Sequence, residues 1–297
     1  MICKNKKYKL DSIEVISILI VTFFALLCLI PFLYVISASF SDENVLVREG
    51  YHIIPRVISL EAYKMVLGGK QIWDSYKVSI AVTLIGTFLS LFFSSLLAYP
   101  LSTRKLKYGA IINFYVYFTM LFSGGLVPTY ILISRYLKMT NTIWVLIIPT
   151  LIIPWNMFLL RNFYSSIPAS LAESARIDGA NDFVILTRII LPCSKPALAT
   201  VGLFYALGYW NEWFKAMLYN SGEKTTWPLQ FLIMQIIRKS ETIANMAAQG
   251  VNVSASNMPS TTMKMATAIC TIGPIVLAYP FVQRYFTGGI MVGSVKG

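Results

Sequence analysis

A short polar segment between two apolar runs carries the clearest local signals in the chain. Ser170 and Glu173 stand at the spacing of a capping box, in which each side chain bonds the backbone N–H of the other residue. Pro168 suits a position just before the helix or in its first turn. Ala172 and Ala175 add small side chains that let another protein surface approach closely. We therefore expect a capped helix that presents the Glu173 carboxylate on an exposed first turn.

A tight turn and a second helix are expected directly after this one. Gly179 stands where a helix can end in a left-handed residue. Asn181 or Asp182 can cap a second helix over 183–190, which we expect to stop before Pro192. The pattern predicts a helical hairpin that could contact another protein. A surface hairpin that only connects two membrane helices is the alternative.

Other residues with reactive side chains are sparse. Cys3, Cys28, Cys193 and Cys270 are not at metal-ligand spacing, and we interpret them as small buried hydrophobic residues. His52 is the single histidine and cannot form a metal site alone. The sequence also lacks a Gly-x-x-x-x-Gly-Lys-Ser/Thr loop that would bind a nucleotide phosphate. If ATP drives this protein, the ATPase is a separate chain.

The composition is that of a membrane protein. Of the 297 residues, 56% are hydrophobic and 13% are charged, about half the charged share of an average soluble domain. So much apolar surface cannot be buried in a globule of this size, which excludes a soluble enzyme, a disordered chain and a collagen-like fibre. The net charge is +12, but the basic residues lie mostly between apolar runs, where they would contact lipid headgroups. Nucleic acid is therefore not expected as a partner.

Six apolar runs are candidates for membrane-spanning helices, since about 20 helical residues cross the hydrocarbon core. The first follows four lysines and could be a secretory signal, but its 27 residues favour a retained span. The fifth contains Glu212 and Lys215, which at i,i+3 can pair near an interface. The runs are 15–41, 78–103, 108–134, 139–160, 196–219 and 265–283.

These runs imply one all-α transmembrane domain over 15–285, with tails at 1–14 and 286–297. With the N-terminus inside, the inner segments hold 13 basic residues and the outer segments 12, so the totals do not decide the orientation. The N-terminal tail and the turn 102–107 are, however, dense in lysine and arginine. We therefore place both termini in the cytoplasm. The polar segments 42–77 and 221–262 are then extracytoplasmic, and 225–237 is expected on or near the outer interface.

The expected hairpin resembles the EAA loop of ABC importer permeases. That pattern is Glu-Ala-Ala, three residues, Gly, nine residues and Ile-x-Leu-Pro. Here Glu173-Ser174-Ala175 is followed by Gly179 and then by Ile189-Ile190-Leu191-Pro192 at the same spacing. Ser174 departs from the pattern, but it is small like the alanine that it replaces.

The resemblance extends over nearly the whole chain. Segments such as 98–102 and 161–163 and the ending 285–297 are similar to the carbohydrate-importer branch. Gly-Gly-x-x-Pro-Thr-Tyr at 124–130 and Tyr-Trp-Asn-x-Trp at 209–213 most resemble permeases for oligosaccharides, of the aldouronate and alginate type.

The resemblance implies a six-helix transmembrane domain of a type I importer in the cell membrane. Such an importer has two permease subunits, here with a homologous but different second permease, two cytoplasmic ATPase subunits and an extracytoplasmic binding protein. ATP and magnesium would be bound by the ATPase, and this chain would need no cofactor. The EAA loop, here 166–195, would seat in a cleft on the ATPase. The implied coupling residues are Ala172, Glu173, Ala175, Asp178 and Gly179.

A carbohydrate substrate requires neutral hydrogen-bonding groups and flat aromatic faces along its path. The candidates are Asn156, Tyr205, Tyr209, Trp210 and Asn211. Tyr205 and Tyr209 are four residues apart and share a helix face, and Asn211 is the alternative lining. Packing is the competing interpretation for the asparagines, and an interfacial aromatic belt for tryptophan and tyrosine.

Other functions remain open at this point. The substrate could be an oligosaccharide, a small sugar or another polar solute. An ion-coupled secondary transporter would need intramembrane ionisable pairs and inverted repeats, which are not visible in the sequence. A membrane enzyme would need a polar catalytic cluster, which is not visible either.

Overall fold

The computed structural model describes residues 12–103, 106–249 and 260–289. These residues are mainly helical, with irregular connections such as 50–60 and an isolated bridge between Ser41 and Ile58. The chain divides into two compact units, 1–68 with 239–270 and 69–238 with 271–297. The predictions for most of the two tails, for Arg104 and Lys105, and for 250–259 lie outside the described residues.

The first unit begins with one long apolar helix. Helix α1 (Ser12–Ser39) exposes hydrophobic side chains along most of its length, as expected for the first span. It is followed by α2 (Glu43–Glu49), which Asp42 caps, and by α3 (Glu61–Gly68). The Glu43 carboxylate accepts hydrogen bonds of 2.8 Å from the backbone N–H groups of Thr261 and Thr262. This carboxylate therefore caps the start of α15 (Thr261–Gly289), the sixth expected span.

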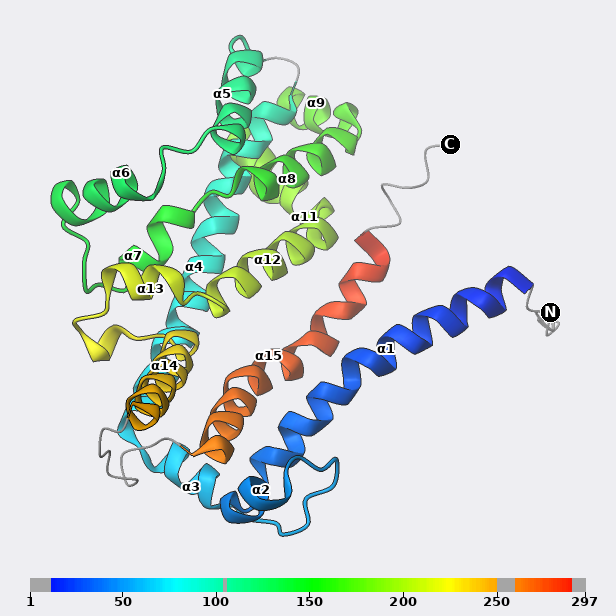
Figure 1. Cartoon of the computed structure of the whole chain (residues 1–297). Coiled ribbons are helices and arrows are strands. Elements are labelled where there is room, and N and C mark those ends of the chain that lie inside the picture. Colours follow the sequence, from blue (N-terminus) through cyan, green and yellow to red (C-terminus); the bar gives the residue numbers. More distant parts are fainter. Residues whose placement is uncertain (1–11, 104–105, 250–259, 290–297) are drawn as a thin grey trace. The chain divides into compact units, whose positions relative to one another are not determined.

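Three helices form the centre of the second unit. The long helix α4 (Lys70–Ser102) packs against α8 (Pro154–Ser166) and α12 (Lys195–Trp210), as Figure 1 shows. The close approach of α4 and α12 depends on small residues. At Gly86 an added Cβ would lie 2.8 Å from a ring carbon of Tyr209.

The third expected span is broken. Helix α5 (Gly109–Leu121) ends after 13 residues, and α6 (Leu126–Ile131) with the π-helical turn η1 (Leu132–Tyr136) continues at an angle of 108°. The expectation of one span over 108–134 missed this bend, which is clear in Figure 1. Its physical cause is the pair Gly124 and Gly125, where Gly125 adopts a φ of +86° that favours glycine.

The fourth and fifth expected spans are also interrupted. Helix α7 (Trp144–Ile147) and the short 3-10 helix η2 (Ile148–Thr150) meet α8 at 52°, with Pro154 in the first turn of α8. Helix α12 ends at Trp210, and α13 (Phe214–Tyr219) follows after a short break. Asn211 is thus the C-terminal cap of α12 and not a residue within a continuous helix.

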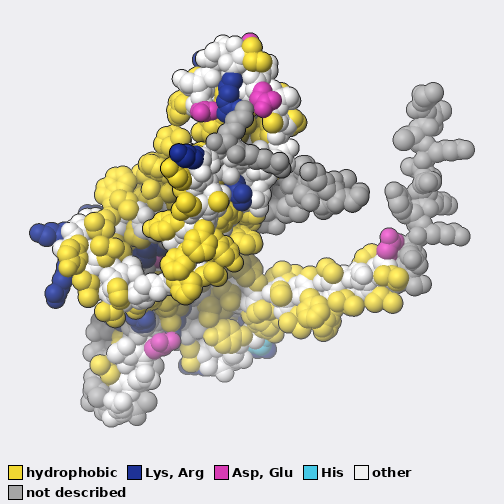
Figure 2. All heavy atoms as spheres, turned by 90° about the horizontal axis from the view of Figure 1, so that it is seen from above, with side chains coloured by type: hydrophobic (Ala, Val, Ile, Leu, Met, Phe, Trp, Pro, Cys, Tyr) yellow, Lys and Arg dark blue, Asp and Glu magenta, His cyan; other side chains and the backbone are white. Residues whose placement is uncertain are grey.

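Much of the surface is apolar. Cys28 and Cys193 are exposed on it, so the expectation that the cysteines are buried is wrong for these two. Hydrophobic side chains cover much of the face that Figure 2 shows, and α1 and α4 are long and apolar enough to cross a membrane. Three further bent helix pairs within the described residues pass the same test when each pair is taken together. After the short 3-10 helix η4 (Lys224–Thr226), helix α14 (Leu229–Ala248) buries Leu229, Phe231 and Leu232.

Candidate functional site

The expected hairpin is present, but its first helix begins differently. Helix α9 (Ala169–Ile177) has Pro168 as its N-terminal cap and no side-chain capping bond. The prediction of a capping box at Ser170 is therefore wrong. Ser170 lies inside the first turn, where its backbone is already helical and cannot serve as the cap.

The turn after α9 is closed as predicted. Gly179 has a φ of +83° and donates its N–H to Arg176 O at 3.1 Å. Ala180 donates to Ala175 O at 2.9 Å, so both bonds of a Schellman motif are formed. Only glycine adopts this backbone conformation without a steric cost, which fixes the direction in which the chain leaves α9.

The second arm of the hairpin is longer than predicted. Asn181 caps α10 (Asp182–Ile185) by accepting from Val184 N at 2.9 Å, which confirms one of the two predicted caps. The helix then continues through the π-helical turn η3 (Leu186–Ile190) into α11 (Leu191–Cys193). The prediction of a stop before Pro192 is wrong, because a wider π turn precedes the proline and accommodates its missing N–H.

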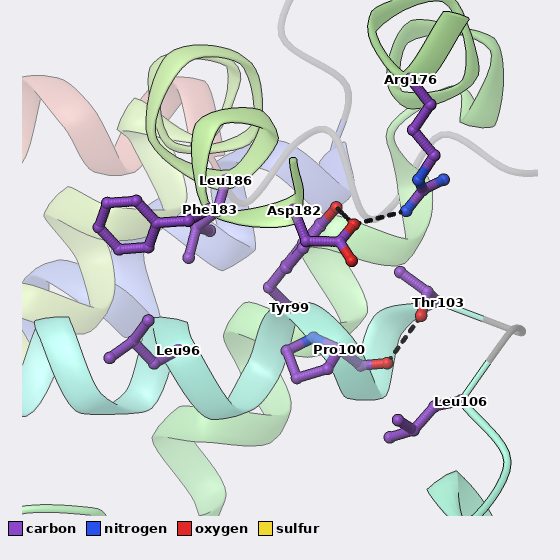
Figure 3. Close-up of a pocket in the computed structure, with 9 residues that line it drawn as sticks. All are labelled: Leu96, Tyr99, Pro100, Thr103, Leu106, Arg176, Asp182, Phe183 and Leu186. Carbon is purple, nitrogen blue, oxygen red and sulfur yellow. Dashed lines mark hydrogen bonds and ion pairs between the residues drawn. The ribbon is translucent and has the colours of Figure 1, made fainter. Parts of the chain in front are cut away.

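An ion pair joins the two arms of the hairpin and ties them to α4. Arg176 Nη2 lies 2.8 Å from Asp182 Oδ1, and the Tyr99 hydroxyl donates to the same oxygen at 3.3 Å. Figure 3 shows the three side chains converging from α9, α10 and α4. The guanidinium holds the pKa of Asp182 below its usual value, and the carboxylate raises that of Arg176. Both side chains are therefore charged at neutral pH.

The C-terminal end of α4 is also fixed by two hydrogen bonds to α8, the helix that leads into the hairpin. Arg161 Nε donates to Leu101 O at 3.0 Å, and Ser165 Oγ donates to Ser102 O at 3.3 Å. A cleft of about 350 Å³ lies between these segments and α9, and its lining includes Ser165, Glu173 and Arg176. A second pocket has a volume of about 310 Å³. Its lining includes both members of the ion pair together with Leu96, Phe183 and Leu186, which Figure 3 labels.

The predicted coupling residues in α9 and in the turn after it differ in exposure. Glu173, Asp178 and Gly179 are exposed on the hairpin. Ala172 and Ala175 are half-buried and pack against the core of the second unit, so their small size allows α9 to approach its own chain.

The sequence interpretation missed two exposed apolar side chains at the tip. Ile177 is 87% exposed and Phe183 is 57% exposed, one on each side of the turn. The available signal was the presence of apolar residues beside a predicted surface turn. Large apolar side chains exposed at such a place indicate a surface that another protein covers.

Three of the predicted path residues lie together in the second unit. The hydroxyls of Tyr205 and Tyr209 pair with Ser94 Oγ at 2.7 Å and with Ser90 Oγ at 2.8 Å, both on α4. Asn156 lies beside the Tyr205 hydroxyl, and all three side chains are buried within this chain. The two tyrosines therefore share a face, as expected, and join α12 to α4.

The other two candidates point elsewhere. Trp210 Nε1 donates to Thr271 O at 3.2 Å and lines an apolar pocket of about 450 Å³ between α4, α12 and α15. Asn211 is exposed and accepts a hydrogen bond of 3.3 Å from Gln230. The two asparagines and Trp210 are thus not gathered in one site.

A small pocket lies on the tyrosine face of α12. Its volume is about 130 Å³, and it holds the predicted pair of Glu212 and Lys215, which forms an ion pair in the structure. The residues that line the pocket are Thr150, Ile153, Tyr205, Gly208, Tyr209, Glu212 and Lys215.

Comparison with known proteins identifies the family. No family model matches the chain. It is 44% identical over 275 residues to the polygalacturonan/rhamnogalacturonan transport system permease protein YtcP of Bacillus subtilis (strain 168), covering 92% of this chain and 94% of that protein. A solved structure, a bacterial ABC transporter involved in the import of the acidic polysaccharide alginate, matches with a TM-score of 0.80 and 32% identity. That match covers 95% of this chain and all of the matched one.

The chain belongs to the ABC transporter permeases. Protein LplC of Bacillus subtilis (strain 168) is a further relative, 39% identical over 284 residues, which are 96% of this chain and 95% of that protein. These matches confirm the resemblance seen in the sequence. As an ABC permease the chain is a transport subunit and not an enzyme, and its apolar helices are those of an integral membrane protein.

Proposed function

We propose that this permease forms one half of the translocation path of an oligosaccharide importer. The names of two matched proteins support a saccharide, since one refers to polygalacturonan and rhamnogalacturonan and the other to alginate. The importer comprises a second, homologous permease, two ATPase subunits that bind ATP and magnesium, and an extracytoplasmic binding protein. This chain itself needs no cofactor.

The hairpin 166–195 is the element that receives the force of ATP hydrolysis. The observation that carries this proposal is the ion pair between Arg176 and Asp182 with the hydrogen bond from Tyr99. Through these contacts a displacement of the hairpin acts directly on α4. The exposed Glu173 and Asp178 and the apolar Ile177 face the ATPase, where a basic residue can pair with the carboxylates.

The membrane arrangement follows from this assignment. The hairpin lies in the cytoplasm together with both termini. The six runs cross the membrane within 15–285, and the third, fourth and fifth of them are bent or interrupted. The segments 42–77 and 221–262 face the outside, where the binding protein delivers its ligand. Tyr205 and Tyr209 with Asn156 are the path residues that the geometry favours over Trp210 and Asn211, because they share one site.

The test is uptake by the complete complex. Proteoliposomes containing both permeases and the ATPases, supplied with the binding protein, are given labelled oligosaccharides, monosaccharides and a polar non-sugar solute. We expect ATP-dependent uptake of an oligosaccharide. Uptake of only a small sugar or only another polar solute would contradict the substrate assignment, and uptake without ATP would contradict the mechanism.

A further inference from the structure

We propose that the break in the third span, residues 122–125, is covered by the second permease, which presents hydrogen-bonding side chains to its open backbone. This inference rests on the proposed function, because that function supplies a second permease within the membrane. It gives a role to the Gly-Gly-x-x-Pro-Thr-Tyr segment at 124–130. It also names a surface of this chain on which the two permeases meet.

The break lies within the hydrocarbon core of the membrane. Helix α5 begins two residues after Lys107, in the turn that we expect on the cytoplasmic side, and its 13 residues rise about 20 Å. Since the core is about 30 Å thick, the break has to cross its outer part. Phe122 has an extended backbone, with a φ of −121° and a ψ of 120°, as expected for a segment that covers distance with few residues. Figure 1 shows this extended connection between α5 and α6.

The backbone of the break is open. Among the described residues, the N–H groups and the carbonyl oxygens of Ser123 and Gly124 form no hydrogen bond. Lipid tails offer no groups that could pair with them. At membrane depth such irregular backbone is therefore found only where protein covers it or where it lines a water-filled cavity.

The break is nevertheless a formed turn. The Gly125 N–H donates to Ser123 Oγ at 3.2 Å, and Thr129 Oγ1 donates to Gly125 O at 2.8 Å. The helix that follows is held to its own unit by Tyr130, whose ring stacks on that of Tyr219 with the ring centroids 5.6 Å apart. The open backbone groups are thus displayed at a defined place and are not the frayed end of a helix.

The side chains around the open backbone are apolar. Leu121, Phe122, Leu126 and Val127 are each more than half exposed. A water-filled path would leave this apolar surface in water, which is unfavourable. A membrane helix that carries serine, threonine or asparagine among apolar residues matches both parts of the surface, because such side chains hydrogen-bond between helices.

The depth of the break identifies the partner. In the proposed importer the ATPases lie in the cytoplasm and the binding protein lies outside the membrane. The second permease is the partner that reaches the hydrocarbon core. We therefore assign the cover of residues 122–125 to a helix of that subunit.

Gly124 is smaller than its own chain requires. Its φ lies outside the left-handed region, unlike that of Gly125, and nothing lies within 4 Å of the position that a Cβ would occupy. Small residues at contacts between membrane helices let the two backbones approach closely. A close approach of the partner helix therefore accounts for a glycine here.

The first experiment is photo-crosslinking in the complete complex. p-Benzoylphenylalanine is placed at Phe122 or, as the matched control, at Phe88, which is also exposed but lies within the continuous helix α4. We expect the probe at Phe122 to capture the second permease with several times the yield of the probe at Phe88. In a complex without the native cysteines, Ser123→Cys should not react with an impermeant thiol reagent, because the partner covers it.

Several results would overturn the inference while the permease function stands. They are a crosslink from Phe122 only to lipid, to the binding protein or within this chain, and equal capture from Phe88. Rapid labelling of Ser123→Cys would place the break in a water-filled path and would overturn it as well. A wild-type preparation that transports without any second permease would instead overturn the proposed function.

A side chain at Gly124 tests the same surface without a probe. Gly124→Leu meets no atom of this chain at its Cβ, and Gly68→Leu is the control at another open glycine, at the end of α3. We expect Gly124→Leu to insert into the membrane but to lower severalfold both the amount of second permease that copurifies and the uptake. Gly124→Ala should have a smaller effect, and Gly68→Leu none. Wild-type copurification and uptake with Gly124→Leu would contradict the proposed contact.

Discussion

The hydroxyl of Tyr99 donates a hydrogen bond of 3.3 Å to Asp182, which joins the C-terminal part of α4 to the second arm of the hairpin. The same carboxylate oxygen receives Arg176 from the first arm at 2.8 Å. One oxygen atom therefore links both arms of the hairpin to the longest helix of the second unit. Since α12 also packs on α4, a force on the hairpin reaches both helices that carry the tyrosine–serine pairs.

Replacing Gly179 should uncouple the transporter. Its φ of +83° is costly for a side-chain-bearing residue, by about 1 kcal/mol or more, and most so for a β-branched one. We expect Gly179→Val to abolish uptake while the protein still inserts into the membrane. Gly179→Asn is the matched control, because asparagine tolerates the left-handed region, and it should retain most of the uptake. Normal substrate-stimulated ATPase activity in the valine variant would contradict the role of the turn.

Removing the charge of Asp182 should reduce the uptake obtained per ATP. We expect Asp182→Asn to lower the ratio of transport to ATP hydrolysis severalfold, because asparagine has no negative charge to pair with Arg176. Tyr99→Phe, which removes only the 3.3 Å hydrogen bond, should have a smaller effect. An unchanged ratio in both variants would mean that the contacts only stabilise the hairpin.

The same pair predicts the pH dependence of coupling. The pKa of Asp182 is lowered by Arg176, so the ion pair is present at neutral pH and is lost only as the pH falls through that lowered value. We expect the ratio of transport to hydrolysis to show no step from this pair between about pH 5 and 8, where carboxylates of lowered pKa stay ionised. A step in this interval that disappears in Asp182→Asn would contradict the assignment.

Gly86 should be intolerant of even one added carbon. A Cβ there would lie 2.8 Å from the ring of Tyr209, whose hydroxyl is also held by Ser90, so the ring cannot easily give way. We expect Gly86→Ala to destabilise the helix pair by about 1–3 kcal/mol, measured by thermal unfolding of the purified complex. Gly208→Ala, the same change at an open position, should not lower the unfolding temperature.

Cysteine labelling tests the proposed orientation. In a variant without the native cysteines, Glu241→Cys in α14 should react with an impermeant reagent added outside intact cells, since its side chain is exposed. Ser174→Cys in α9 is also exposed but should react only after the membrane is opened. The reverse pattern would invert the topology.

Local signals in the sequence predicted the parts of the site that depend on neighbouring residues. The left-handed Gly179, the Asn181 cap and the Glu212–Lys215 pair all follow from spacings of a few residues. The Tyr99–Asp182 contact joins positions 83 residues apart, and no periodicity in the sequence predicts it.

Hydropathy located the apolar runs but not their breaks. A run stays apolar whether its helix is straight or bent, so hydropathy did not predict the 108° bend at Gly124 and Gly125. The π turn before Pro192 was missed for a similar reason. Proline disfavours an ordinary helix, and whether the chain stops or widens depends on the packing around it.

The most direct test of the account is uptake driven by ATP alone. Proteoliposomes containing the complete complex, with the binding protein and labelled oligosaccharide outside and ATP with magnesium inside, are measured without any ion gradient. We expect uptake that stops when ATP is omitted, and no uptake by the Gly179→Val complex. Uptake that proceeds without ATP and follows an imposed proton or sodium gradient would contradict it.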